Sequence, residues 1–122
     1  MTLRSPARLT SLYIFSKMQY IYSIKKKLIV KRLQWDSLNT EHIADHDVMP
    51  DEVQEVCNGK PVVRKGHKNR LFLIGKTKQD RLLTVILQST ATDGVYRPIT
   101  AYEASKTSTK TYHEEKGGEK AA

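Results

Sequence analysis

The feature that most constrains the fold is a series of closely spaced strand-like segments in the second half of the chain. Runs of apolar and β-branched residues recur between turn signals. They are "PVVRK" (61–65), "RLFLIGK" (70–76), "RLLTVILQS" (81–89) and "VYRPITA" (95–101). The sequences "TKQD" (77–80) and Asp93-Gly94 are typical of the tight connections that join antiparallel neighbours. The pattern therefore predicts an antiparallel sheet.

A further strand and a short helix are predicted ahead of this sheet. The run "LIVKRLQW" (28–35) is rich in apolar and β-branched residues, which favours a first strand. Asp36 can cap the helix that follows, because an aspartate oxygen accepts hydrogen bonds from the free amides of a first helical turn. Leu38 and Ile43 supply apolar positions of this helix, and Asp47 stands where a left-handed residue would close it.

The stretch "MPDEVQEVCNG" (49–59) predicts a second helix. Pro50 suits the first helical position, where no amide hydrogen is needed. Asp51 and Glu52 place negative charge at the positive end of the helix dipole. Asn58-Gly59 is a typical helix stop.

The order of these elements predicts an α+β domain, with a small antiparallel sheet, the N-terminal helix pair packed on it and a C-terminal helix. The C-terminal helix is expected at residues 103–112 and is polar. Residues 113–122, "HEEKGGEKAA", are expected to be a flexible tail. The folded domain is thus predicted to span residues 28–112.

Length and composition indicate one small domain with a single core, because the chain has 122 residues and is 39% hydrophobic. Cys57 is the only cysteine, so no internal disulfide can form, and a reducing cytoplasm is the expected compartment. Val53 and Val56 stand at helical spacing beside it, which favours a packed core cysteine over a nucleophile.

The formal net charge of +8 is unevenly distributed along the chain. Residues 1–35 hold eight Lys or Arg and no Asp or Glu, which accounts for the whole excess. Residues 36–59 hold seven acidic side chains and no Lys or Arg, whereas residues 60–81 hold eight Lys or Arg and one acidic residue, Asp80. This segregation predicts an acidic helix surface and a basic sheet surface that attracts phosphate.

Residues 1–27 are basic and contain no apolar run longer than four residues, which excludes a membrane span and the apolar region of a secretory signal. We expect a basic extension outside the folded domain. A targeting or membrane-surface role, and a translation start at Met18, stay open as alternatives.

His42 and His46 raise the possibility of a metal site, because two imidazoles four residues apart lie on one face of a helix. A zinc-protease motif places glutamate directly after the first histidine, but Ile43 stands there. A structural site needs two further ligands that the neighbouring sequence does not offer. The sequence therefore predicts neither a metal nor another cofactor.

Taken together, "WDSLNTEHIADHDVMPDEVQEV", "RLFLIGKT", "RLLTVIL" and "DGVYRPITA" resemble the BrnT group of toxins in the RelE/ParE superfamily. The resemblance covers roughly residues 30–112. It implies a RelE-like fold and a ribonuclease toxin of a type II toxin-antitoxin pair. It also implies a hetero-oligomer with a ribbon-helix-helix antitoxin such as BrnA.

The resemblance carries over to individual positions. Those that agree with the family are the basic Arg70, Lys76, Arg81 and Arg97 and the aromatic Tyr112. Two positions depart from the family pattern: Tyr102 stands where an arginine is usual, and Ser108 where an acidic residue is usual.

Metal-free RNA cleavage needs a positioned strand, stabilised charge on the phosphoryl oxygens and two proton transfers, as the 2′-hydroxyl attacks the adjacent phosphate. We expect Arg81 and Arg97 to be exposed and to meet at one phosphate from paired strands. The remaining candidates are Arg70 and Lys76 as strand clamps or proton-transfer helpers, and His67 or Tyr112 as the acid-base partner.

Two other functions stay open. A ParE-like inhibitor would share the fold but bind DNA gyrase without cleaving nucleic acid. The departures at Tyr102 and Ser108 also allow an inactive relic or a regulatory nucleic-acid-binding module.

Overall fold

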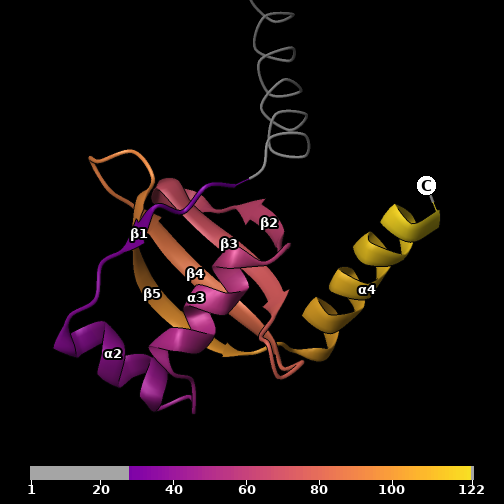
Figure 1. Cartoon of the computed structure of the whole chain (residues 1–122), viewed down its shortest axis with the longest axis horizontal. Helices are drawn as coiled ribbons and strands as arrows, with labels where there is room; N and C mark the ends of the chain where they lie inside the picture. The colour runs from indigo at the N-terminus through magenta and orange to yellow at the C-terminus, as the bar shows by residue number, and fades with distance from the viewer. Residues whose placement is uncertain (1–27, 122) are drawn as a thin grey trace, which may run out of the picture.

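A computed structural model of the protein describes residues 28–121. The predicted basic extension, residues 1–27, lies outside the described residues. The elements in chain order are β1 (Arg32–Leu33), α2 (Ser37–Ala44), α3 (Pro50–Asn58), β2 (Val62–Lys65), the 3-10 turn η1 (His67–Asn69), β3 (Arg70–Lys76), β4 (Leu82–Ser89), β5 (Val95–Glu103) and α4 (Lys106–Ala121). Figure 1 shows α3 in front of the strands, α2 at the lower left of the sheet and α4 set apart on the right.

The two predicted helices form where their local signals place them. The Asn39 amide donates to Asp36 Oδ1 at 2.9 Å, and the Asp36 amide donates to Asn39 Oδ1 at 2.9 Å, which closes a reciprocal cap. Asp47 has a φ of 61°, which confirms the left-handed residue after α2. Pro50 occupies the start of α3, and the helix ends at Asn58 as predicted.

The five strands form one sheet in the spatial order β1-β5-β4-β3-β2. β2 to β5 pair antiparallel with their sequence neighbours, as predicted. β1 is the exception, because it pairs parallel with β5 through Arg32 opposite Val95 and Leu33 opposite Tyr96. The sheet is therefore mixed, and the prediction of a wholly antiparallel sheet was wrong at this edge. The predicted strand at residues 28–35 is reduced to two paired residues.

The core lies between the sheet and the helix pair. Leu73, Val85 and Ala101 stand opposite one another on β3, β4 and β5 and are fully buried. Val53 and Ile43, from α3 and α2, are equally buried in the same cluster. α3 lies against β3 and β4, and α2 lies against β5. This arrangement confirms the predicted α+β domain with the helix pair packed on the sheet.

The C-terminal helix differs from its prediction at both ends. β5 runs through Glu103, and α4 then continues from Lys106 to Ala121, so most of the predicted loose tail is helical. Ser105 supplies the start signal, since its hydroxyl accepts a hydrogen bond from the Ser108 amide at 3.1 Å. Gly117, from the predicted tail, lies inside the helix.

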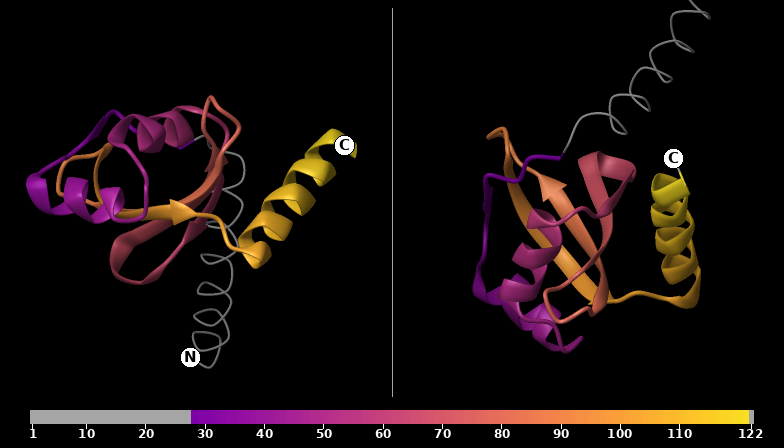
Figure 2. Two further views of the ribbon diagram at one scale, coloured as in Figure 1. Left: turned by 90° about the horizontal axis from the view of Figure 1, so that it is seen from below. Right: turned by 45° about the vertical axis from the view of Figure 1, so that its right-hand side comes forward.

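α4 lies across the sheet from the helix pair (Figure 2). An ion pair between Glu115 of α4 and Arg64 of β2 joins the helix to the sheet. Among residues 28–121, no helix is both long and apolar enough to cross a lipid bilayer.

Candidate functional site

Two arginines and a glutamine form a row across three strands. Arg70 of β3 stands opposite Gln88 of β4, and Gln88 stands opposite Arg97 of β5. Side chains directly opposite each other in an antiparallel pair share a face. The alternating core residues, such as Leu71 and Leu87, point toward the helix pair. The row therefore lies on the opposite face of the sheet, where α4 also lies.

Arg70 is held in this row by a neutral partner. Its Nε donates to Gln88 Oε1 at 3.1 Å. The amide nitrogen of Gln88 donates in turn to the carbonyl oxygen of Lys68 at 2.7 Å. The chain of hydrogen bonds fixes the guanidinium without placing an opposite charge against it. Gln88 was not predicted as a site residue, because a glutamine inside an apolar strand carries no motif.

The turn η1 brings His67 to the same end of the sheet. Lys68 and Asn69 follow it with φ of 57° and 62°, a left-handed conformation that is uncommon for residues other than glycine. Ser89 supports this turn, since its hydroxyl donates to the Asn69 carbonyl at 3.1 Å. His67 lies in the β2–β3 connection, three residues before Arg70, and is exposed.

Arg97 has an acidic partner. Its guanidinium forms an ion pair with Asp36, the residue that caps α2. The hydrogen bond from Arg97, followed by that from the Asn39 amide, lowers the pKa of Asp36 from its ordinary value. The Arg97 side chain is 34% exposed. A phosphate that binds Arg97 would therefore compete with Asp36.

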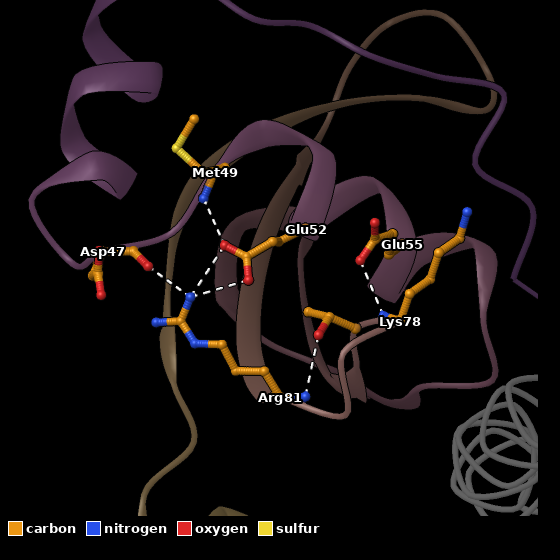
Figure 3. A network of polar contacts seen from close by, with 7 residues as sticks. Asp47, Met49, Glu52, Glu55, Lys78 and Arg81 are labelled. Carbon is orange, nitrogen blue, oxygen red and sulfur yellow. Dashed lines mark hydrogen bonds and ion pairs between the residues drawn. The ribbon is translucent and has the colours of Figure 1, made fainter.

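Arg81 lies at the far end of β4 and is directed toward the helix pair (Figure 3). Its Nη1 donates to both carboxylate oxygens of Glu52 at 3.1 Å and to the Asp47 carbonyl at 2.6 Å. Its side chain is only 24% exposed. The prediction of an exposed Arg81 was therefore wrong, because Glu52 lies in a separate helix that the sequence could not place.

Arg81 and Arg97 are also far apart along the sheet. Arg97 stands opposite Gln88, seven residues along the chain from Arg81. At about 3.3 Å per strand residue, this separation is about 23 Å. The prediction that both guanidiniums meet at one phosphate is wrong. Lys76 lies near Arg81, at the end of β3, and its Nζ is 3.1 Å from Asp80.

Tyr112 lies on α4, where its ring centroid is 5.7 Å from that of His113. The Lys116 ammonium lies 5.7 Å from the centroid of the Tyr112 ring. Tyr102, at the position where the resembling family has arginine, lies in β5 with its ring 5.9 Å from that of His46. The His46 ring is in turn 5.3 Å from that of His42.

The histidine pair lies on the helix side of the molecule, in α2 and the turn after it. Across the described part of the chain, His, Cys, Asp and Glu side chains nowhere gather in a group of three or more that could hold a metal ion. A separate open groove of about 530 Å³ lies between α3 and the β3–β4 turn. Its walls carry both charge signs, including Asp51, Glu55, Lys76 and Lys78.

These features define a small α+β protein with an arginine-bearing sheet face and an acidic helix pair behind it. Comparison with protein-family models finds no match, and neither does comparison with curated proteins. Among solved structures, the crystal structure of the Brucella abortus ribonuclease toxin BrnT is similar, with a TM-score of 0.51 and 20% sequence identity. The match covers 62% of this chain and 97% of that chain. The protein therefore has a BrnT-like fold.

Proposed function

We propose that this protein is the toxin of a type II toxin-antitoxin pair and cleaves RNA without a metal. The observation that carries the proposal is the row of Arg70, Gln88 and Arg97 on one sheet face of a BrnT-like fold. Arg70 and Arg97 lie on the two strands that flank β4. Guanidiniums suit the recognition of phosphate, because each presents a fork of donors to its oxygens.

In the proposed reaction, the 2′-hydroxyl of one nucleotide attacks its own 3′-phosphate and the 5′-oxygen of the next nucleotide leaves. Arg70 stabilises the negative charge that develops on the phosphoryl oxygens, and Arg97 joins it after leaving Asp36. His67, at the same end of the sheet, exchanges the proton of the nucleophile or of the leaving oxygen. Tyr112 is the alternative acid-base group.

The other two predicted cations have a different role in this proposal. Lys76 and Arg81 lie at the far end of the strands, and both have carboxylate partners, Asp80 and Glu52. Lys76 is suited to clamp the strand away from the scissile phosphate. Arg81 orders the helix pair and acts on RNA only indirectly.

The proposed partner is a ribbon-helix-helix antitoxin of the BrnA kind, which would form a hetero-oligomer with this chain and silence it. The basis is that the structural neighbour BrnT is a ribonuclease toxin. Co-expression with the product of an adjacent short reading frame should relieve growth inhibition and yield a co-purifying complex. Growth inhibition that such a product fails to relieve would contradict this assignment.

Cleavage of RNA by the purified protein, with and without EDTA, tests the proposed activity. Arg70→Ala and Arg97→Ala should each reduce the rate by roughly a hundredfold to a thousandfold, the usual loss when one preorganised donor is removed. Arg32→Ala is the matched control, because it removes an exposed cation from the edge strand β1. Full activity in both arginine variants, or activity that is lost with EDTA and restored by zinc or magnesium, would overturn the proposal.

A function without cleavage is the second candidate. The observation that favours it is Tyr102, which stands at the expected arginine position and lies against His46. A gyrase inhibitor would block DNA supercoiling and leave RNA intact, whereas an inactive relic would do neither and would not inhibit growth. RNA cleavage, gyrase supercoiling and growth on induction, measured on the same preparation, distinguish the three.

A further inference from the structure

Phe72 is an exposed aromatic residue beside the arginine row. It follows Arg70 by two residues on β3 and so points to the same face of the sheet. Its cross-strand neighbours are Arg64 on β2 and Ile86 on β4. Phe72 is 37% exposed, whereas Ile74, the next β3 residue on this face, is 8% exposed. The exposed ring thus lies at the open part of the face.

Gly66 supports the ring from one side. A Cβ atom built on Gly66 would lie 2.5 Å from Cε1 of Phe72 and 3.0 Å from Cδ1, so the ring lies directly against the glycine backbone. This contact restricts the ring before any ligand arrives. A ring that is already restricted loses little conformational entropy on binding. Its flat face suits a planar ligand.

The surroundings of Phe72 are positively charged. Residues 60–79 contain seven Lys or Arg and no Asp or Glu. Arg64 pairs with Glu115 of α4, but these two side chains are 52% and 46% exposed. An exposed ion pair of this kind contributes little, so an anionic ligand can displace Glu115 from Arg64. Arg70 adds a second guanidinium, whose Nε donates to the neutral amide of Gln88.

We propose that Phe72 is a stacking platform for one unpaired base of a single-stranded RNA, with Arg64 and Arg70 on the flanking phosphates. An aromatic ring between cations on a sheet is how many proteins hold single strands, because every base has a π-face and every linkage a negative charge. The inference rests on the proposed function for its ligand class. It adds a base-binding subsite that the cleavage chemistry itself does not need.

Binding of a short, fluorescently labelled 2′-O-methyl RNA tests the subsite. This strand lacks the 2′-hydroxyl nucleophile, so affinity is measured without cleavage. Phe72→Leu should weaken binding by roughly 5- to 150-fold, the range of losses when one base-stacking aromatic is removed. Phe72→Tyr should bind as the wild type does. The log-log salt slope should stay the same in both variants, because no charge is changed.

Two further arms separate stacking from other roles of the ring. A strand of abasic sugar-phosphates should bind the wild type and Phe72→Leu equally. Gly66→Ala should weaken binding of the base-bearing strand, because its methyl group displaces the ring while the charges stay. Leu38→Ala is the matched control, since Leu38 is a 72% exposed apolar residue on α2.

Equal affinity of wild type and Phe72→Leu for the base-bearing strand would overturn the proposal. An equal loss of affinity of Phe72→Leu for the abasic strand would also overturn it. A change in self-association alone, measured by sedimentation, would overturn it too, because the ring would then belong to a protein contact. If Phe72→Leu does not fold, weak binding by a folded Phe72→Tyr would overturn it instead. A protein that passes these tests but leaves RNA intact would refute the proposed cleavage alone.

Discussion

Replacing Arg81 by alanine should destabilise the whole domain, because this side chain joins the sheet to the turn between α2 and α3. Its guanidinium donates to Glu52 and to the carbonyl of Asp47, a residue held at a φ of 61°. Glu52 also accepts the amide of Met49 at 3.0 Å and so completes the start of α3. One arginine therefore fixes both the helix turn and the helix start (Figure 3).

The magnitude follows from the burial of the pair. The side chains of Arg81 and Glu52 are 24% and 20% exposed. Exposed ion pairs contribute about 0–1 kcal/mol, whereas breaking a buried pair costs about 3–5 kcal/mol. An intermediate pair with an additional carbonyl hydrogen bond should contribute about 2 kcal/mol. For a domain of this size, this loss corresponds to a decrease in Tm of about 8–16 °C.

Thermal unfolding followed by circular dichroism measures the effect. Lys78→Ala is the matched control, because it removes a cation from the adjacent turn. The hydrogen bond from Lys78 to Glu55 is made by the backbone amide, so the substitution preserves it. A double-mutant cycle with Glu52→Gln should give a coupling free energy of about 1–2 kcal/mol between the two side chains. A Tm for Arg81→Ala within about 2 °C of the control would refute the structural role and make Arg81 a candidate RNA contact again.

Three further predictions concern a carboxylate, the thiol and the extension. Asp36→Asn keeps the helix cap but removes the negative charge. The pKa of Asp36 in the folded protein is below its ordinary value of 3.8. Ionised Asp36 therefore stabilises the fold above pH 3.8, and this stability is lost as the pH falls through the folded pKa. Acid titration of unfolding should therefore be shallower for the variant below pH 3.8. Burial raises the pKa of Cys57 to about 12, so its thiol should react with a disulfide reagent at pH 8 only after unfolding in urea. Removal of residues 1–27 should leave the domain folded and decrease the salt dependence of RNA binding, by about 0.7 in log-log slope for each phosphate that the extension neutralises.

The helix ends could be predicted from sequence because their signals are local. The Asp36 cap, the left-handed Asp47 and the Pro50 start each involve residues within five positions of one another, and each lies where it was predicted. The strands from residue 61 onward were also predicted to within two residues at their ends. Alternation of apolar residues is likewise a local property.

Features that depend on distant residues were not predictable in the same way. The pairing of β1 with β5 joins Leu33 to Tyr96, and nothing in either segment specifies a parallel partner. The placement of Arg81 depends on Glu52, which lies in another helix. The register of β4 against β5 separates Arg81 from Arg97, and a one-residue irregularity at Ile86 and Leu87 changes which β5 residue faces Gln88.

Acidic residues of the segment 36–59 pair with two of the three arginines, which makes Arg70 the best candidate to bind phosphate. The acidic segment does not merely form a separate surface, since Glu52 and Asp36 from it pair with Arg81 and Arg97. Arg70 instead donates to the neutral amide of Gln88. An anionic ligand therefore meets less competition at Arg70 than at the other two arginines.

Gln88→Glu tests whether Arg70 binds phosphate. The substitution keeps the size of the side chain and places a carboxylate where Gln88 Oε1 now lies, 3.1 Å from Arg70 Nε. We expect weaker binding of a 2′-O-methyl RNA and a log-log salt slope shallower by about 0.7, the equivalent of one phosphate contact. Gln88→Met is the control, because it also removes the hydrogen bond to the Lys68 carbonyl but adds no charge. Equal affinity and equal salt slope in the two variants would mean that the charge of Arg70 does not contact the RNA, and the phosphate site would then have to lie elsewhere on this face.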